Sequence, residues 1–518
     1  MSNSDRIAAI RDLVGESSVV EPSDRYTRDY SVFSATPGTI VRPSSSEAIS
    51  HLLQWASNEQ VDVVARAGGS NTGGAAITDG ILLLMTDDHF AELRIDPLTH
   101  VAHVGSAVRH DTLQQALREH NLWLPSDPSS GPLSYIGGNV NTRASGPHAL
   151  AHGAIDRFVI AATGVLSDGT TFETNKPATI PSYMLDRLAR LGKKLRADTS
   201  SRTLLERKRH LKCAAGYDLL ALVDSEPVEA LPRLICGSMG TLCLVTSVTL
   251  RCVEMARQSR SLLIPFASGG AACETTLALR NDAAAIEILS GSSTTLAPDA
   301  FGLPEEHRRA TVLLIEYQGN DAAEVEQRID NAVTIATKHG ALASLVRRAT
   351  DENDVARWWK ARKSLLPRLQ QATRGQARLP YSIVNDVGVP PEKLETLLGI
   401  SEQIFGDHDL PSVIYGHAGS GNLHLRPLFP QRDEVTVRTI AHAIYSAATD
   451  LGGTITAEHG MGRLRAPFLE LEWGTRIYDY MRELKEIFDP VGILNPGVLF
   501  VPPGHDFLSS GWPGGTSL

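Results

Sequence analysis

The chain has 518 residues, of which 42% are hydrophobic, and it carries a formal net charge of −10. This length and composition predict a globular protein with two or three packed domains. The acidic balance argues against a nucleic-acid-binding protein, which usually presents a basic domain or stripe.

The N-terminus is polar and lacks the apolar core of a secretory signal. Residues 1–35 are expected to form a helical segment, because Ile7 to Leu13 has the apolar spacing of an amphipathic helix. The uncharged run from Leu234 to Leu250 is too short and too rich in Gly, Ser and Thr for a transmembrane segment. We therefore expect a cytoplasmic protein, with peripheral docking on the inner membrane as an alternative.

From about residue 36, short β-branched runs alternate with helical patterns, which indicates α+β or α/β packing. Val61 to Val64 and Ile81 to Leu84 are predicted strands, and His110 to Glu119 is a predicted helix. Phe158 to Leu166 is a further strand that leads into the turn Ser167-Asp-Gly-Thr, a strong hairpin signal.

A Gly-rich block, Arg66-Ala-Gly-Gly-Ser70-Asn71-Thr72-Gly-Gly74, follows the first of these strands. It matches neither the dinucleotide fingerprint that opens a helix nor the Walker phosphate loop. Successive small residues after a strand let several backbone N–H groups face one anion, such as a pyrophosphate. Pro125-Ser-Asp-Pro-Ser129 and Gly137-Gly138-Asn139 offer further backbone for close approach. The simpler interpretation is that each block is only a tight turn.

The stretch from Lys176 to Lys212 is rich in Lys and Arg. We favour a solvated helical insertion with a charged face over a surface that touches an anionic partner or a membrane. The five cysteines show no C-x-x-C spacing, so neither an iron–sulfur or zinc-ribbon site nor a disulfide framework is indicated.

Near Arg251 the pattern changes to longer helices between strands, such as Asp321 to His339, and a second domain is placed there. Ile477 to Phe488 is a predicted helix, stopped by Asp489-Pro490. Residues 502–518, rich in Pro, Gly and Ser, are expected to form a loose tail.

Two histidines flank a second Gly-rich run in Tyr415-Gly-His417-Ala-Gly-Ser-Gly-Asn422-Leu-His424. The glycines break the strand, so the segment predicts a hairpin across which His417 and His424 face each other. With Glu458 they would form a shell with an open position, suited to Zn, Mn or Fe(II), and His459 would remain as a general base. The alternative is that the glycines are turn residues and the histidines ordinary core or surface residues.

Seven motifs occur in order along the chain: Arg66-Ala-Gly-Gly-Ser-Asn-Thr-Gly-Gly, Ile136-Gly-Gly-Asn-Val-Asn-Thr-Arg-Ala-Ser-Gly146, Ala215-Gly-Tyr-Asp-Leu219, Gly237-Ser-Met-Gly-Thr241, Gly416-His-Ala-Gly-Ser-Gly-Asn-Leu-His424, Glu458-His-Gly460 and Phe488-Asp-Pro-Val-Gly-Ile-Leu-Asn-Pro-Gly497. Together they resemble the motifs of the vanillyl-alcohol-oxidase-type, or PCMH-type, FAD flavoproteins. The branch is the one that holds D-lactate dehydrogenases, the glycolate oxidase flavin subunit and D-2-hydroxyglutarate dehydrogenases. The similarity covers about residues 20–500.

The resemblance implies an α+β fold with a PCMH-type FAD-binding domain of two subdomains over 36–253. An α+β cap domain over 254–455 follows, and a C-terminal helical segment, 456–501, returns to complete the flavin site. Flavin is expected to be non-covalent, because Ser70 stands where relatives with covalent flavin have His and no Cys precedes residue 213. The implied FAD-binding residues are Arg66, Gly68, Gly69, Ser70, Asn71, Thr72, Ser126, Asp127, Gly137, Gly138, Asn141, Ser145, Gly146, Gly153 and Asn495.

The implied reaction is FAD- and metal-dependent oxidation of a D-2-hydroxy acid, with D-lactate placed ahead of D-2-hydroxyglutarate and glycolate. The metal ligands would be His417, His424 and Glu458, and His459 would take the hydroxyl proton. Arg362 matches the carboxylate-pairing Arg of the family, unless it is only a helix-surface residue, and Asn422 is a candidate to orient the substrate or the ligand shell.

Two other functions stay open: a sugar or alcohol oxidase of the same superfamily, and a non-catalytic flavin-binding subunit. Without a cysteine-rich region, electrons are expected to pass to a separate iron–sulfur subunit, a quinone, a cytochrome or dioxygen. A homo-oligomer is expected.

Four positions depart from the family pattern. Ser420 replaces an Asp of the His-rich loop, Met239 replaces a Glu, and Arg143 stands where a small or amide residue is common. Val384 stands near the place where some D-2-hydroxyglutarate enzymes have a Lys, which weakens that substrate assignment.

Overall fold

The computed structural model describes residues 3–349, 351–431 and 433–502. The first of its three large sheets has the strand order β1-β2-β4-β3, with β2, β4 and β3 parallel. Two helices pack on this sheet through one apolar cluster. The second of them begins after Ser45, whose side chain accepts a hydrogen bond from the N–H of Ala48. The elements are α1 (Asn3–Val14), β1 (Val19–Val20), β2 (Thr39–Val41), α2 (Ser46–Glu59), β3 (Val63–Arg66) and β4 (Ile81–Leu84).

The second sheet has five antiparallel strands in the order β5-β6-β10-β8-β9. Its central strand is the last in the chain, so the segment between β9 and β10 is a helical insertion that leaves the sheet and returns to it. The strands are β5 (Leu93–Asp96), β6 (Val101–Gly105), β8 (Val159–Val165), β9 (Thr171–Glu173) and β10 (Leu244–Arg251). The principal helices are α3 (His110–Arg118), α4 (Ile136–Thr142), α6 (Ser182–Ala197), α7 (Thr199–Arg207) and α9 (Pro227–Ile235).

The third sheet has seven antiparallel strands in the order β15-β12-β14-β13-β18-β19-β17. Alternate residues of β14 serve its two faces: Val312 and Leu314 pack with Trp358, whereas Leu313 and Ile315 pack with Val325. The strands are β12 (Gln258–Phe266), β13 (Ala285–Leu289), β14 (Thr311–Gly319), β15 (Arg347–Arg348), β17 (Val387–Gly388), β18 (Ser412–His417) and β19 (Asn422–Pro427). The principal helices are α10 (Gly269–Leu279), α13 (Ala322–Lys338), α14 (Glu352–Lys363), α15 (Leu365–Ala372), α16 (Leu394–Asp407) and α17 (Glu434–Asp450).

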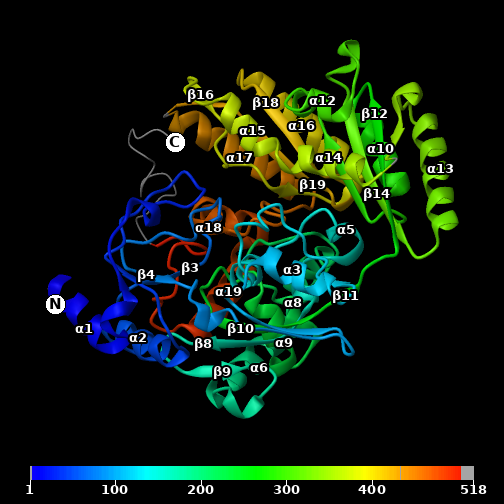
Figure 1. Cartoon of the computed structure of the whole chain (residues 1–518). Coiled ribbons are helices and arrows are strands. Elements are labelled where there is room, and N and C mark those ends of the chain that lie inside the picture. Colours follow the sequence, from blue (N-terminus) through cyan, green and yellow to red (C-terminus); the bar gives the residue numbers. More distant parts are fainter. Residues whose placement is uncertain (1–2, 350, 432, 503–518) are drawn as a thin grey trace.

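The C-terminal segment returns to the first sheet. After α19 (Leu469–Phe488), which is kinked at Gly474, the N–H of Val63 donates to the carbonyl of Ile493, and the N–H of Asn495 donates to the carbonyl of Val63. Figure 1 shows the seven-stranded sheet with its helices above the two other sheets, and the C-terminal segment, in red, back beside β3 and β4. The C-terminal segment therefore packs on the N-terminal region of the chain, below the seven-stranded sheet in this view.

The α+β architecture predicted from the sequence is confirmed. The helices predicted at His110 to Glu119 and Asp321 to His339 are α3 and α13. The helix predicted from Ile477 is the second part of α19, which begins eight residues earlier, at Leu469. The predicted tail, 502–518, lies outside the described residues except for residue 502. Within the described ranges, no helix combines the length and the apolarity that crossing a membrane requires.

Candidate active site

The histidine hairpin forms as predicted. β18 and β19 pair antiparallel, with Tyr415 opposite His424 and His417 opposite Asn422. Gly421 takes φ +70° at the turn, a conformation that favours glycine. The Nε2 atoms of His417 and His424 lie 3.3 Å apart. The Gly-rich turn thus converts a seven-residue spacing into a facing pair.

Glu458 completes a triangle with these imidazoles. Its Oε1 lies 3.3 Å from His417 Nε2 and 3.4 Å from His424 Nε2. Zinc bonds of about 2.0–2.1 Å in tetrahedral geometry imply ligand-to-ligand distances of about 3.3 Å. The three donor atoms therefore fit one divalent cation, with room for a further ligand.

Asp386 belongs to a second, looser grouping with His424, Glu458 and His459, whose donor atoms lie within 4.8 Å of one another. Its carboxylate is already committed, because Oδ2 accepts from the N–H groups of Glu458 and His459 and from the hydroxyl of Thr456. Asp386 therefore holds the loop that carries Glu458 and His459, and the triangle with His417 is the set of donor atoms that fits a cation.

The sequence analysis missed Glu287, the fully buried carboxylate behind His417. Its Oε1 accepts from His417 Nδ1 at 2.5 Å, and its Oε2 lies 2.6 Å from Nε of Arg362. Arg362 also stacks over the ring of Tyr415, 4.7 Å from its centroid. The predicted helix-surface alternative for Arg362 is thereby contradicted, since this guanidinium is buried. A lone Glu in the apolar strand Ala285–Leu289 was the available signal.

Lys212 was also missed. The basic stretch is the helical insertion that the sequence predicts, with exposed residues such as Lys193, Lys194 and Arg207, but Lys208 and Lys212 are exceptions. Nζ of Lys212 lies 2.6 Å from Glu458 Oε2 and donates to Asn422 Oδ1 at 3.2 Å. Lys208 is buried too, paired with Glu472 at 2.7 Å. Glu458 thus gives Oε2 to Lys212 and keeps Oε1 for the two histidines.

Asn422 is fully buried and holds the ligand shell. Its amide donates to Asp386 Oδ1 and to the carbonyl of Val387. It is not among the residues that line the adjacent cavity. Of the two roles predicted for Asn422, the geometry favours orientation of the ligands over contact with a substrate.

The hydrogen bonds fix which nitrogens are free. Nδ1 of His417 donates to Glu287, and Nδ1 of His424 donates to the carbonyl of Asn385, so both Nε2 lone pairs face Glu458. Burial lowers the pKa of His424 well below 6.5, whereas for His417 Glu287 outweighs burial and raises the pKa. Burial raises the pKa of Glu458, but Lys212 and the histidines bring it well below 4.5. His424 and Glu458 are therefore a neutral imidazole and a carboxylate, the forms that bind metal.

His459 is fixed by Asn385. Arg465 Nη2 donates to the side-chain oxygen of Asn385, so the amide nitrogen faces Nδ1 of His459 at 3.1 Å. Nδ1 therefore accepts, and the proton of the neutral ring is on Nε2, 3.5 Å from Glu458 Oε1. Burial lowers the pKa of His459, which keeps the ring neutral near pH 7.

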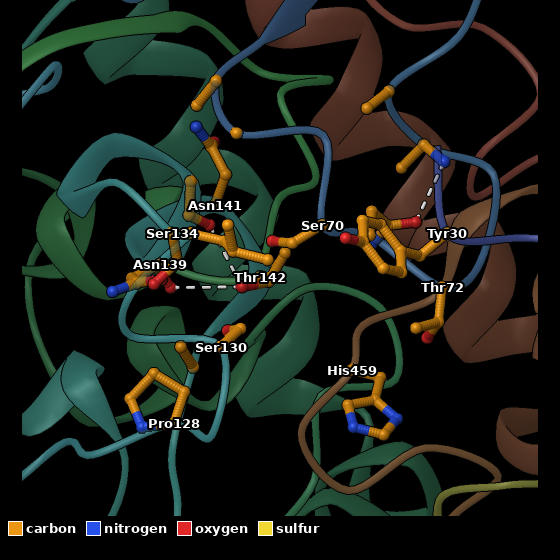
Figure 2. Close-up of a pocket in the computed structure, with 18 of the residues that line it drawn as sticks. Tyr30, Ser70, Thr72, Pro128, Ser130, Ser134, Asn139, Asn141, Thr142 and His459 are labelled. Carbon is orange, nitrogen blue, oxygen red and sulfur yellow. Dashed lines mark hydrogen bonds between the residues drawn. The ribbon is translucent and has the colours of Figure 1, made fainter. Parts of the chain in front are cut away.

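A cavity of about 360 Å³ joins this cluster to both Gly-rich blocks. Figure 2 shows polar residues of the two blocks around the same hollow as the His459 ring. Ten of the fifteen predicted FAD-binding residues line it, together with Arg362, His424, Glu458 and His459. The ten are Gly68, Gly69, Ser70, Asn71, Thr72, Gly137, Gly138, Asn141, Ser145 and Asn495.

The cavity wall fits a large polar ligand. Seven residues that line it carry a buried side-chain polar atom without a hydrogen-bond partner among the described residues: Thr72, Ser106, Ser134, Asn139, Arg362, Arg426 and Asn495. Such atoms are costly unless a ligand or water satisfies them. The backbone of the first block also approaches closely, since a Cβ on Gly68 would lie 2.0 Å from the carbonyl oxygen of Leu133. The residues present therefore fit FAD.

Five predicted FAD-binding residues do not line the cavity. Arg66 donates to the carbonyls of Ala76 and Arg28 and so braces the first block from behind. Ser126 donates to the carbonyl of Ala144, and Asp127 pairs with His148 at 2.8 Å. Their neighbours line the cavity instead: Pro128, Ser129 and Ser130.

The two remaining residues of this group, Gly146 and Gly153, pack against protein. A Cβ on Gly146 would lie 2.4 Å from the carbonyl oxygen of Asp127, and one on Gly153 would lie 2.4 Å from Cδ of Arg157. Both glycines permit close packing beside the site, and neither contacts its hollow.

The four departures from the family pattern have separate environments. Met239 has φ +57° and lines the cavity. Arg143 donates to the carbonyls of Cys213 and Cys236, so it supports the chain next to Lys212. Ser420 lies in the hairpin turn with a buried hydroxyl that has no partner in the described chain, and Val384 is buried away from the cavity.

Two family models match the chain. The FAD binding domain matches residues 37–175, and the C-terminal domain of FAD linked oxidases matches residues 255–499. Glycolate oxidase subunit GlcD of Bacillus subtilis is 30% identical over 90% of each chain. D-lactate dehydrogenase of Archaeoglobus fulgidus is 28% identical, over 92% of this chain and 96% of its own. D-2-hydroxyglutarate dehydrogenase of Escherichia coli is 25% identical, over 93% of this chain and 50% of its own.

Solved structures of the same fold include p-cresol methylhydroxylase, with a TM-score of 0.68 at 13% identity over 97% of this chain and 98% of its own. Alkyldihydroxyacetonephosphate synthase has a TM-score of 0.67 at 17% identity, over 96% of this chain and 85% of its own. These likenesses concern the fold alone. They confirm the predicted fold class.

Proposed function

Because this chain belongs to the family of FAD-linked oxidases and is an FAD-dependent oxidoreductase, we propose that it oxidises a D-2-hydroxy acid to the 2-oxo acid with the aid of a divalent metal. One observation carries the proposal: His417 Nε2, His424 Nε2 and Glu458 Oε1 converge within 3.4 Å at the wall of the cavity that fits FAD. A bound metal supplies a Lewis acid that lowers the pKa of the substrate hydroxyl, and bound FAD accepts the hydride.

The protein's own groups prepare the substrate. Arg362 lines the cavity, and its Nη2 is buried without a hydrogen-bond partner in the described chain, so it is available to the carboxylate of a 2-hydroxy acid. Glu287 fixes the other side of this guanidinium. The same carboxylate orients His417, so one buried Glu sets both the anion site and a metal ligand.

We assign proton uptake to His459. In the resting arrangement its Nδ1 accepts from Asn385 and its Nε2 bears the proton. Nε2 becomes a base in the other neutral tautomer, in which Nδ1 carries the proton; the carboxylate of Asp386, 3.7 Å from Nδ1, favours a proton at that nitrogen by its charge. Proton transfer by a positioned base contributes about 10²–10⁴-fold to the rate.

The test is a screen of paired D- and L-2-hydroxy acids with an artificial dye as electron acceptor, before and after chelation. We expect D-specific dye reduction that a chelator abolishes and Zn, Mn or Fe(II) restores. Turnover of simple sugars or alcohols would favour the sugar or alcohol oxidase, and FAD binding without turnover of any of them would favour a non-catalytic flavin-binding subunit.

FAD is proposed to be non-covalent, with Ser70 in the loop where covalent relatives have His. Denaturation should release all the yellow colour from the chain into the filtrate. Colour that stays with the denatured protein contradicts this assignment.

The natural acceptor is proposed to be a separate iron–sulfur subunit, a quinone or a cytochrome. A homo-oligomer and a cytoplasmic location, with peripheral contact to the inner membrane, remain part of the same proposal. To distinguish the acceptors, the dye is replaced by quinone analogues, by a cytochrome or by dioxygen, and the reduction of each is measured.

A further inference from the structure

A second arginine, Arg426, lines the cavity wall without a carboxylate partner. It follows His424 by two residues on β19, so both side chains leave the same face of the strand. Arg426 is 2% exposed and lines the cavity. In the described chain its side chain makes one hydrogen bond, from Nη1 to Ser382 Oγ at 2.6 Å, and its buried Nε has no partner.

Two of the other three buried cations of the site have a carboxylate partner, and the third bonds to neutral oxygens of the protein. Arg362 has Glu287 and Lys212 has Glu458. Arg465 donates to the carbonyl of Gly460 and to Asn385 Oδ1. Like Arg465, Arg426 has no carboxylate at ion-pair distance among the described residues, but of these two arginines only Arg426 lines the cavity.

A guanidinium stays charged in proteins, and burying an unpaired charge is strongly unfavourable. Four buried cations, Arg362, Lys212, Arg426 and Arg465, here surround three buried carboxylates, Glu287, Glu458 and Asp386. Of the two arginines without a carboxylate, Arg426 is the one on the cavity wall beside His424. This arrangement suits an anionic ligand group that arrives from the cavity.

We propose that Arg426 determines specificity by binding a second anionic group of the substrate, so that 2-hydroxy dicarboxylic acids are preferred over monocarboxylic ones. This inference rests on the proposed function. Residues two apart on a strand are separated by about 7 Å. A carboxylate separated from the hydroxyl-bearing carbon by two methylene groups has a reach of that order, while Arg362 receives the carboxylate next to the hydroxyl.

The test compares two substrates of equal chain length, D-2-hydroxyglutarate and D-2-hydroxypentanoate, in which a methyl group replaces the distal carboxylate. We expect kcat/KM of the wild-type holoenzyme to favour the diacid at least about 100-fold, as for a charge-assisted bidentate pair. Arg426→Met should lower kcat/KM for the diacid about 100-fold and change that for the monoacid less than about threefold. Arg426→Lys should restore part of the preference.

A binding measurement supplies a second readout. The flavin absorbance change on titration with 2-oxoglutarate and 2-oxopentanoate should show the same preference in the wild type and its loss in Arg426→Met. Arg374→Met, an exposed arginine of the same domain, is the matched control and should leave both values unchanged. FAD and metal content report whether each variant is folded.

The outcomes separate two failures. If no 2-hydroxy acid is oxidised, the proposed function fails. If monoacids are oxidised as well as diacids, or if Arg426→Met lowers both equally, only this inference fails, and equal loss would assign Arg426 to the carboxylate beside the hydroxyl. Should Arg426→Met not fold, the ratio of kcat/KM for the diacid to that for the monoacid, measured in the wild type and in Arg426→Lys, still tests the inference.

Discussion

Two histidine clusters, one around His148 and one around His424, shift the pKa of these two rings in opposite directions. His148 has a carboxylate at each nitrogen, Asp127 at 2.8 Å and Glu316 at 3.3 Å. Burial lowers the pKa of His148, but these two carboxylates raise it well above 6.5. His424, in contrast, donates from Nδ1 to a carbonyl, and its Nε2 faces His417 Nε2 at 3.3 Å and Glu458 Oε1 at 3.4 Å. Burial outweighs this single carboxylate and lowers the pKa of His424 well below 6.5.

The contrast shows that burial alone does not decide the state of an imidazole: two carboxylates outweigh it at His148, whereas burial prevails at His424. Two carboxylates make His148 a cation that bridges Asp127 of the FAD-binding region and Glu316 of the cap strand β14. Such a ring has no free lone pair and cannot bind metal. His424 keeps a lone pair at Nε2, because only Nδ1 is engaged, and so it can be a ligand.

The largest expected effect comes from removing one imidazole from each cluster, which tests the roles assigned to His424 and His148. His424→Ala should abolish metal binding and lower kcat/KM about 10³-fold or more, because the metal supplies the Lewis acid. His148→Gln should keep the metal and change kcat/KM less than about tenfold, since it contacts no donor atom. Metal analysis and steady-state kinetics check both. Metal loss in His148→Gln, or metal retained in His424→Ala, would reverse the assignment.

Removal of the proposed base tests whether His459 has a different role from the metal ligands beside it. His459→Gln should lower kcat about 10²–10⁴-fold while FAD and metal stay bound. Near-normal turnover across the pH range would exclude His459 from proton transfer. An unchanged absorbance spectrum of the bound flavin would show that the substitution leaves the FAD site intact.

Lys212→Met tests how Glu458 is oriented. Without the pair at 2.6 Å, Oε1 is no longer held toward the histidines, and metal affinity should fall about 10–100-fold. Lys208→Met, in the same stretch but paired with Glu472, is the matched control. It should lower stability and leave metal affinity unchanged. Competition with a chromogenic chelator measures the affinity, and equal effects of the two substitutions would contradict the assignment.

The smallest effect concerns pH and the bridging cluster. Because the folded-state pKa of His148 is raised, its stabilisation is complete below the unfolded pKa of about 6.5 and is lost as pH rises through the folded value. The wild-type melting temperature should therefore fall by a few degrees in alkaline solution. In His148→Gln that part of the decline should be absent. Melting curves from pH 6 to pH 10 check this.

Other titratable groups around His148 have pKa values shifted in the opposite direction, so they affect stability in a different pH range. Asp127 and Glu316 have pKa values below their ordinary ones despite burial, because His148 faces both, so they affect acid stability. His152 has a lowered pKa, from burial and the nearby His148. An alkaline decline that is identical in the wild type and in His148→Gln would assign it to other groups.

Local patterns in the sequence predicted the parts of the site that neighbouring residues build. The glycines between His417 and His424 encode the hairpin, and the Gly-rich runs after β3 and in α4 encode backbone that a ligand can approach. Each depends on backbone conformation and side-chain alternation over fewer than a dozen residues. Such signals are contained in the sequence itself.

The charge partners were decided only by the tertiary structure. Lys212 meets Glu458 across 246 residues, and Glu287 meets His417 across 130. Arg426 gives no sign in the sequence that it lacks a carboxylate. The sequence shows which residues are charged. Whether a charge is solvated, paired or available to a ligand depends on which distant segments pack around it.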